Sequence, residues 1–130
     1  MRDTDPSIPE ISTPPQLIFD LITNTDVLEH IPEKDLNDVI SHIHSLCKNC
    51  YFNIHTGPAK LILPSGENAH CTIREPEWWL EKIQAFFPNA RITKIEGKHC
   101  TIKTWPKSYK HLFKRFIYMW REKIAKKTLL

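Results

Sequence analysis

Short apolar runs alternate with segments of helical periodicity along this chain, and this alternation constrains the fold more than any other feature. Residues 17–22 (LIFDLI) form a nearly continuous apolar run, typical of a strand buried on both faces of a parallel sheet. In residues 33–47, apolar side chains recur at the three- and four-residue spacing of one helix face. A second apolar run at residues 50–55 is followed by helical spacing in residues 76–87. Strands that alternate with helices predict an α/β fold.

The last third of the chain predicts an antiparallel hairpin followed by a helix. Residues 90–95 and 98–105 have the composition of two strands, and Gly97 between them suits a tight turn. In residues 108–127, apolar side chains share one helix face and basic side chains cover the rest. The sequence therefore predicts a mostly parallel sheet with an antiparallel pair at one margin, followed by a basic amphipathic helix.

These elements divide the 130 residues into three segments. Residues 1–16 contain four prolines and are expected to form an irregular N-terminal segment. Residues 17–106 form the α/β domain, and residues 107–130 form the basic C-terminal helix. The connection over residues 57–75 is longer than a compact domain needs for a turn, and long loops often carry function.

Charge is distributed unevenly along the chain. Residues 1–40 hold nine acidic and two basic side chains, whereas residues 81–130 hold three acidic and thirteen basic ones. The basic end suits contact with nucleic-acid phosphates or with an anionic membrane surface. A helix that packs on the sheet and exposes its charged face explains the same pattern, and we favour that interpretation.

The composition argues against a membrane span and against a secreted scaffold. No run approaches the roughly 20 apolar residues of a membrane helix, and the polar start does not resemble a signal peptide. We therefore expect a cytoplasmic protein. The four cysteines are expected to be reduced thiols, because Cys47 and Cys50 lack the second close pair that a zinc site usually needs.

Acidic and histidine side chains gather where the predicted strands end. Asp26, Glu29 and His30 follow the first strand, and His70 lies in the long connection after the second. Ligands of open α/β sheets bind beyond the carboxyl ends of the strands, so the two segments predict a site. Asp26 and Glu29 alternatively suit the capping of the next helix.

The same four side chains offer two further alternatives. Their oxygen and nitrogen atoms form a ligand set suited to Mg²⁺, Mn²⁺ or Fe²⁺. Histidines that fix the loop by hydrogen bonds, or that transfer a proton, explain the pattern without an ion. We favour this second interpretation and predict no metal from the sequence.

These motifs resemble those of class I S-adenosylmethionine-dependent methyltransferases. Residues 19–32 (FDLITNTDVLEHIP) resemble the fourth strand of that family and the loop after it. Residues 54–59 (IHTGPA), 63–70 (LPSGENAH) and 75–80 (EPEWWL) resemble the fifth strand and its loop in a methyltransferase group of phages and bacteria. The resemblance covers roughly residues 5–105 and only the C-terminal half of the family fold. It implies a partial Rossmann-like sheet in the family order four, five, seven, six, with flanking helices.

The resemblance also implies a cofactor, S-adenosylmethionine, and residues that line it. Thr25, Asp26 and Val27 match the family's cofactor-lining positions after the fourth strand. Asp5 matches the acidic residue that ends the family's second strand and holds the ribose hydroxyls.

By the resemblance, Glu29 and His30 would face the methyl acceptor. His70 would meet them from the second strand end. We therefore expect Glu29, His30 and His70 to be catalytic, and an imidazole that titrates near working pH suits His30 or His70 as the general base.

The chain departs from the family pattern because it lacks the glycine-rich cofactor loop. Its only glycines are Gly57, Gly66 and Gly97, and none precedes residues 17–22. In the family order this strand pairs on both sides, so here it would leave an open edge. We therefore expect a truncated or split methyltransferase that transfers methyl groups only when a second chain complements it. The alternative is a non-catalytic module that binds protein or nucleic acid.

Overall fold

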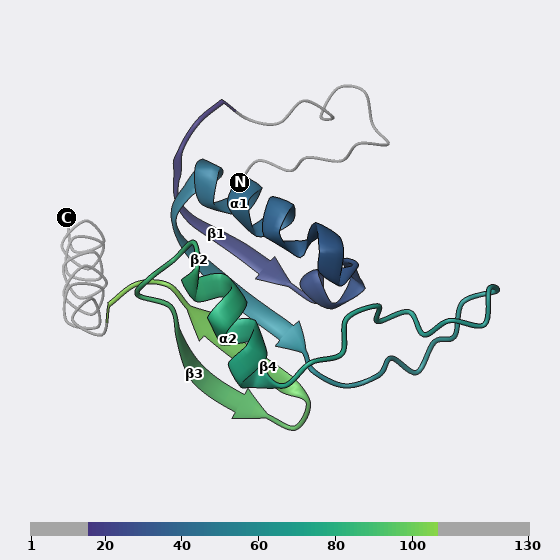
Figure 1. Cartoon of the computed structure of the whole chain (residues 1–130). Coiled ribbons are helices and arrows are strands. Elements are labelled where there is room, and N and C mark those ends of the chain that lie inside the picture. Colours follow the sequence, from purple (N-terminus) through teal and green to yellow (C-terminus); the bar gives the residue numbers. More distant parts are fainter. Residues whose placement is uncertain (1–15, 107–130) are drawn as a thin grey trace, which may run out of the picture.

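The computed structural model describes residues 16–106 of the chain. Within this range, a four-stranded sheet carries two α-helices, and a long loop projects away from the sheet (Figure 1). The predicted tail up to residue 15, including Asp5, and the predicted C-terminal helix over residues 107–130 lie outside the described residues. No helix within the described range is long and apolar enough to cross a membrane.

The elements follow the alternation that the sequence predicts. Two short 3-10 turns connect the first strand to the first helix. In chain order the elements are β1 (Phe19–Thr25), η2 (Leu28–His30), η3 (Glu33–Asp35), α1 (Leu36–Leu46), β2 (Cys47–His55), α2 (Pro76–Gln84), β3 (Arg91–Glu96) and β4 (His99–Lys103).

The sheet has the order β1-β2-β4-β3. Strand β1 pairs with β2 in parallel, whereas β4 runs antiparallel to both β2 and β3. With β1 in the position of the family's fourth strand, this is the predicted order four, five, seven, six. The α/β prediction and the marginal antiparallel pair are therefore confirmed.

The bounds of β1 differ from the predicted range of residues 17–22. The strand begins later and continues through the polar residues Thr23 and Thr25, which pair with Tyr51 and Asn53 of β2. Backbone pairing needs no apolar side chain, so the ladder extends past the apolar run.

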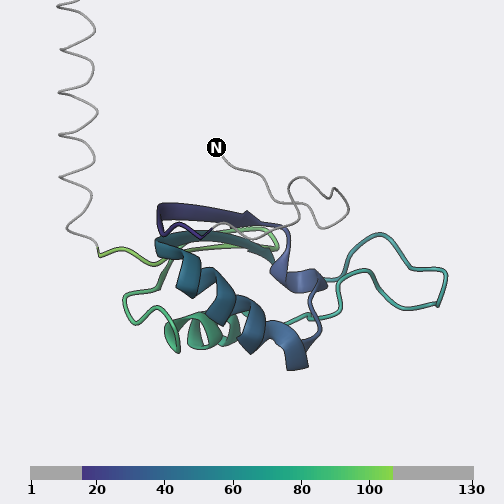
Figure 2. The same ribbon diagram turned by 90° about the horizontal axis from the view of Figure 1, so that it is seen from above.

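Within residues 16–106, helices cover one face of the sheet and no helix covers the other. Figure 2 shows α1 and α2 on the same face. The prediction that the first strand is buried on both faces is wrong, because Leu21 is 48% exposed and no element of residues 16–106 covers its side of the sheet. Strand β1 also has a single neighbouring strand within that range.

The hydrophobic core lies between the sheet and the two helices. From Cys50 to Ile54, alternate side chains of β2 face the helices, and Phe52 and Ile54 are fully buried there. They pack with Ile40 of α1 and with Trp79 and Ile83 of α2. The core is therefore complete on one face of an otherwise open sheet.

All four cysteines are free thiols in this structure. Cys71 is exposed, and the other three are buried. A hydrogen bond to the Cys50 side chain lowers the pKa of Cys47, and the same interaction together with burial raises the pKa of Cys50. Burial raises the pKa of Cys100 to about 11.

Candidate functional site

The chain turns sharply where β1 ends. Asp26 has a φ of 52°, in the left-handed region that residues other than glycine seldom adopt. Its N–H donates a hydrogen bond to the Asn53 carbonyl oxygen at 3.0 Å, which holds the turn against β2. Leu28, two residues later, is fully buried and anchors η2. Such a backbone costs about 1–3 kcal/mol and is concentrated at functional sites in proteins.

Glu29 is fully buried beneath this turn. Its Oε1 accepts a hydrogen bond from the His55 N–H at 3.2 Å. Its Oε2 is also buried and has no hydrogen-bond partner among the described residues. Burial of a carboxylate oxygen without a hydrogen-bond partner lowers the stability of the fold. Packing alone therefore does not explain why a glutamate occupies position 29.

Neither Asp26 nor Glu29 caps a helix. No side chain forms a capping hydrogen bond at the N-terminus of η2, η3 or α1. The capping alternative is therefore wrong.

The Asn68 side chain connects the two sides of the loop over residues 57–75. The Asn68 Oδ1 accepts hydrogen bonds from the N–H groups of Ala59 and His70, both at 2.9 Å, and its Nδ2 donates to the Ala59 carbonyl oxygen at 3.0 Å. This side chain fixes both sides of the loop and sets the position of His70. Sequence reasoning missed this role, although asparagine side chains in loops commonly form hydrogen bonds with nearby backbone groups.

The end of the same loop is attached to η2. Thr72 is buried, its N–H donates to the Glu29 carbonyl oxygen at 3.1 Å, and its hydroxyl donates to the Ile31 carbonyl oxygen at 2.8 Å. The Cys71 thiol donates to the His30 carbonyl oxygen at 3.0 Å. Residues distant in sequence are thereby held in fixed positions around Glu29.

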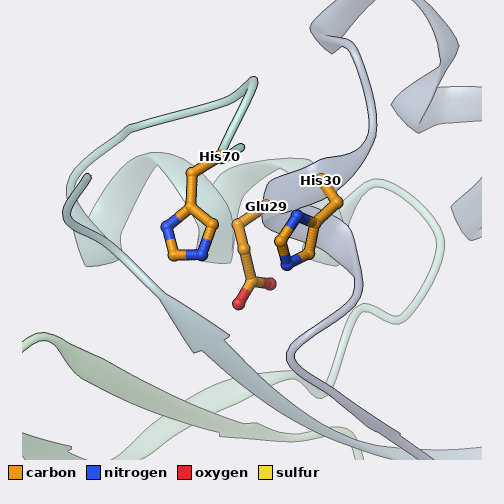
Figure 3. A group of neighbouring side chains, drawn as sticks. All are labelled: Glu29, His30 and His70. Carbon is orange, nitrogen blue, oxygen red and sulfur yellow. The ribbon is translucent and has the colours of Figure 1, made fainter. Parts of the chain in front are cut away.

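Glu29, His30 and His70 come together at this junction (Figure 3). One ligand atom from each lies within 4.8 Å of the other two. The two imidazole rings have centroids 4.8 Å apart and meet edge to face. The structure therefore places the three predicted catalytic side chains side by side, at the ends of the parallel strands.

The hydrogen bonds of the two histidines determine which ring nitrogen carries a proton. The Nδ1 of His30 lies 2.9 Å from the Ala69 carbonyl oxygen, and the Nδ1 of His70 lies 2.7 Å from the Gly57 carbonyl oxygen. A carbonyl oxygen only accepts hydrogen bonds, so each Nδ1 must be the donor. In the neutral ring each Nε2 then carries a free lone pair.

Two further histidines extend the cluster, and sequence reasoning missed both. The His55 ring centroid lies 4.8 Å from that of His70 and 4.8 Å from that of His99. The Nδ1 of His99 lies 3.2 Å from Asn53 Oδ1 and 3.7 Å from Asp26 Oδ1. His55 ends β2 and His99 begins β4, so only the antiparallel register brings them together.

The predicted cofactor residues lie beside this cluster. Thr25, Asp26 and Val27 are exposed at the end of β1, and Asp26 Oδ1 lies 3.7 Å from His99 Nδ1. The described residues contain no glycine-rich turn. Asp5 lies outside the described residues.

The comparisons with known proteins concern the fold. No family model matches the sequence, and no curated protein matches it. The solved structure of the DhpI–SAH complex is similar with a TM-score of 0.55 and 15% sequence identity, over 71% of this chain and 49% of that one. The chain thus spans about half the length of the structure it matches. Its described residues have a class I methyltransferase-like fold, with a four-stranded sheet and flanking helices.

Proposed function

We propose that this chain is part of an S-adenosylmethionine-dependent methyltransferase and acts when a second segment completes the cofactor site. The observation that carries the proposal is the convergence of Glu29, His30 and His70 beside the exposed turn at Asp26, on a class I methyltransferase-like sheet. The similar DhpI structure contains SAH, the form that S-adenosylmethionine takes after it has lost its methyl group.

The residues of this chain would position and deprotonate the methyl acceptor. Methyl transfer requires the acceptor atom, the methyl group and the leaving sulfur to lie in line, so alignment supplies much of the rate. The free Nε2 atoms of His30 and His70 are suited to accept the acceptor's proton. Glu29 would favour the positive charge that a protonated imidazole acquires.

The open edge of β1 is where we expect the complementing segment to pair. Leu17, Ile18 and Leu21 are 60%, 70% and 48% exposed at this edge. An apolar strand with unpaired backbone groups is a template for an added strand. A strand there would place its carboxyl end beside Thr25 and Asp26, where the second wall of the cofactor site is needed.

A second candidate function is nucleic-acid binding by the open face of the sheet. A shallow cavity of about 450 Å³ on this face is lined by basic and aromatic side chains. The Lys103 Nζ lies 5.8 Å from the Tyr51 ring centroid and 5.5 Å from that of Trp105. Clustered cations beside flat rings suit phosphates and stacked bases, as in single-strand binding proteins.

Backbone amide NMR of the full chain tests the first candidate against the second. We expect millimolar SAH to shift the amide signals of Thr25, Asp26 and Val27, because one wall gives weak but localised binding. A single-stranded RNA oligonucleotide should leave these signals unchanged. The proposal would be refuted if SAH shifts no signal in this turn, and RNA shifts at Tyr51 and Lys103 would then favour the binding module.

A further inference from the structure

We propose that Glu29, His30 and His70 form a binding site for one divalent transition-metal ion. The ligand atoms would be Glu29 Oε2 and the two Nε2 atoms. Figure 3 shows the Glu29 carboxylate directed into the space between the two imidazole rings. The three groups come from η2 and from the loop after β2, so the fold builds the site from two separate segments.

Glu29 provides the first argument for an ion. The side chain is fully buried, its Oε1 is used by the His55 N–H, and its Oε2 has no partner within residues 16–106. Buried charges in proteins are paired or coordinate metals, because an uncompensated carboxylate is strongly unfavourable away from water. A cation beside Oε2 would compensate this charge.

The two histidines provide an independent second argument. The Nδ1–H groups of His30 and His70 each donate to a backbone carbonyl oxygen, at 2.9 and 2.7 Å. Metal-binding histidines commonly donate their other ring N–H in this way, which fixes the ring orientation and directs the free nitrogen at the ion. Both rings therefore have the orientation typical of metal-binding histidines, in which Nδ1–H is hydrogen-bonded and the Nε2 lone pair is left for an ion.

The ligand set selects the class of ion. Two imidazole nitrogens and one carboxylate oxygen suit Fe²⁺, Zn²⁺ or Mn²⁺, whereas Mg²⁺ and Ca²⁺ prefer oxygen ligands throughout. Ligand atoms around such an ion lie roughly 3.0–3.5 Å apart, given bond lengths of about 2.0–2.2 Å. One ligand atom from each side chain lies within 4.8 Å of the other two, which is wider than a bound ion allows, so side-chain rotations must draw the ligand atoms together on binding.

Three protein ligands leave coordination positions open. His30 is exposed and His70 is half-buried, so these positions are accessible from solvent. With an ion bound, the two Nε2 atoms would be ligands and would not accept the acceptor's proton. An oxygen of the methyl acceptor would instead coordinate at an open position next to the turn at Asp26, and the ion would favour loss of its proton to solvent. This role in methyl transfer rests on the proposed function, whereas binding of the ion does not.

Calorimetric titration of the full chain with Mn²⁺ and Zn²⁺, without SAH, tests the site. We expect one ion per chain, with a dissociation constant in the micromolar range or below. The substitutions Glu29→Gln, His30→Asn and His70→Asn should each weaken binding at least about tenfold. Gln retains an acceptor for the His55 N–H, and the Asn amide replaces the Nδ1–H donor, so each variant removes the ligand atom and preserves the hydrogen bond.

One histidine outside the site serves as a matched control. His42 is exposed on α1. The His42→Asn variant should bind the ion as the unmodified chain does, and thermal unfolding without metal should show that all variants fold. The absence of saturable binding at about 1 mM ion would overturn the proposal, as would an equal loss in the His42→Asn variant.

A negative result in the metal titration and a negative result in the SAH experiment lead to different conclusions. Metal binding that depends on Glu29 would support the site even if SAH shifts no amide signal near Asp26. If SAH shifts those signals and neither ion binds, the two imidazoles act without a metal, and this inference is wrong while the proposed function stands.

Discussion

Replacement of Asn68 by alanine should release His70 without unfolding the domain. The substitution removes three hydrogen bonds, to the Ala59 N–H, the Ala59 carbonyl oxygen and the His70 N–H. At about 1 kcal/mol each, the loss is about 3 kcal/mol. This free energy stabilises the loop and not the core, so the equilibrium constant for local opening should rise by roughly a hundredfold.

Native-state amide hydrogen exchange measures this opening directly. We expect faster exchange at the amides of Ala59 and His70, with unchanged exchange at Phe52 in the core strand. Asn68→Asp is the matched control, because it keeps the two acceptor contacts and loses only the Nδ2 donor, for about 1 kcal/mol. Equal effects of the two variants, or unchanged exchange in Asn68→Ala, would refute the reasoning.

The remaining predictions concern the core, the thiols and the open edge. Trp79→Ala should lower the free energy of unfolding by about 3–5 kcal/mol in urea titrations, because the side chain is fully buried; a loss below about 1 kcal/mol would contradict the described core. At pH 8, iodoacetamide should label Cys71 and spare Cys100, whose pKa burial raises to about 11; equal labelling rates would contradict this difference. The same raised pKa means that the folded state retains the Cys100 proton longer, so stability should fall as pH rises from 9.0 toward about 11, and Cys100→Ala should remove that part of the pH dependence. Leu21→Lys at the edge strand should change the free energy of unfolding by at most about 0.5 kcal/mol in urea titrations, because the side chain is exposed; a loss above about 1 kcal/mol would contradict the exposed position of Leu21.

The arrangement of elements was predictable because the local signals agree with the packing. The helical spacing in residues 33–47 predicts the face of α1 that covers the sheet, including Ile40 and Ile43. The bounds of β1 were less predictable, because pairing with β2, and not side-chain hydrophobicity, decides where that strand ends. The strand order itself followed from the family resemblance, since periodicity carries no information on which strands are neighbours.

The candidate site was predictable in its members but not in its chemistry. Sites form at the carboxyl ends of parallel strands, and this rule predicts from the sequence alone that Glu29, His30 and His70 lie close together. The orientation of the rings depends on carbonyl groups of Gly57 and Ala69, in a loop whose path no local pattern specifies. The free Nε2 atoms and the unpartnered carboxylate oxygen therefore became visible only in the structure.

The distribution of burial explains how this sheet can carry an ordered site. Helices α1 and α2 bury one face of the sheet, and fully buried side chains such as Phe52 and Trp79 give that layer its own core. The candidate metal ligands are attached to this layer, because Glu29 is fully buried and accepts a hydrogen bond from the His55 N–H at the end of β2. The predicted cofactor residues Thr25, Asp26 and Val27 are instead exposed at and after the end of β1, which has one neighbouring strand within residues 16–106. Metal binding should thus survive in the isolated chain, whereas tight binding of the cofactor should require the segment that completes the β1 edge.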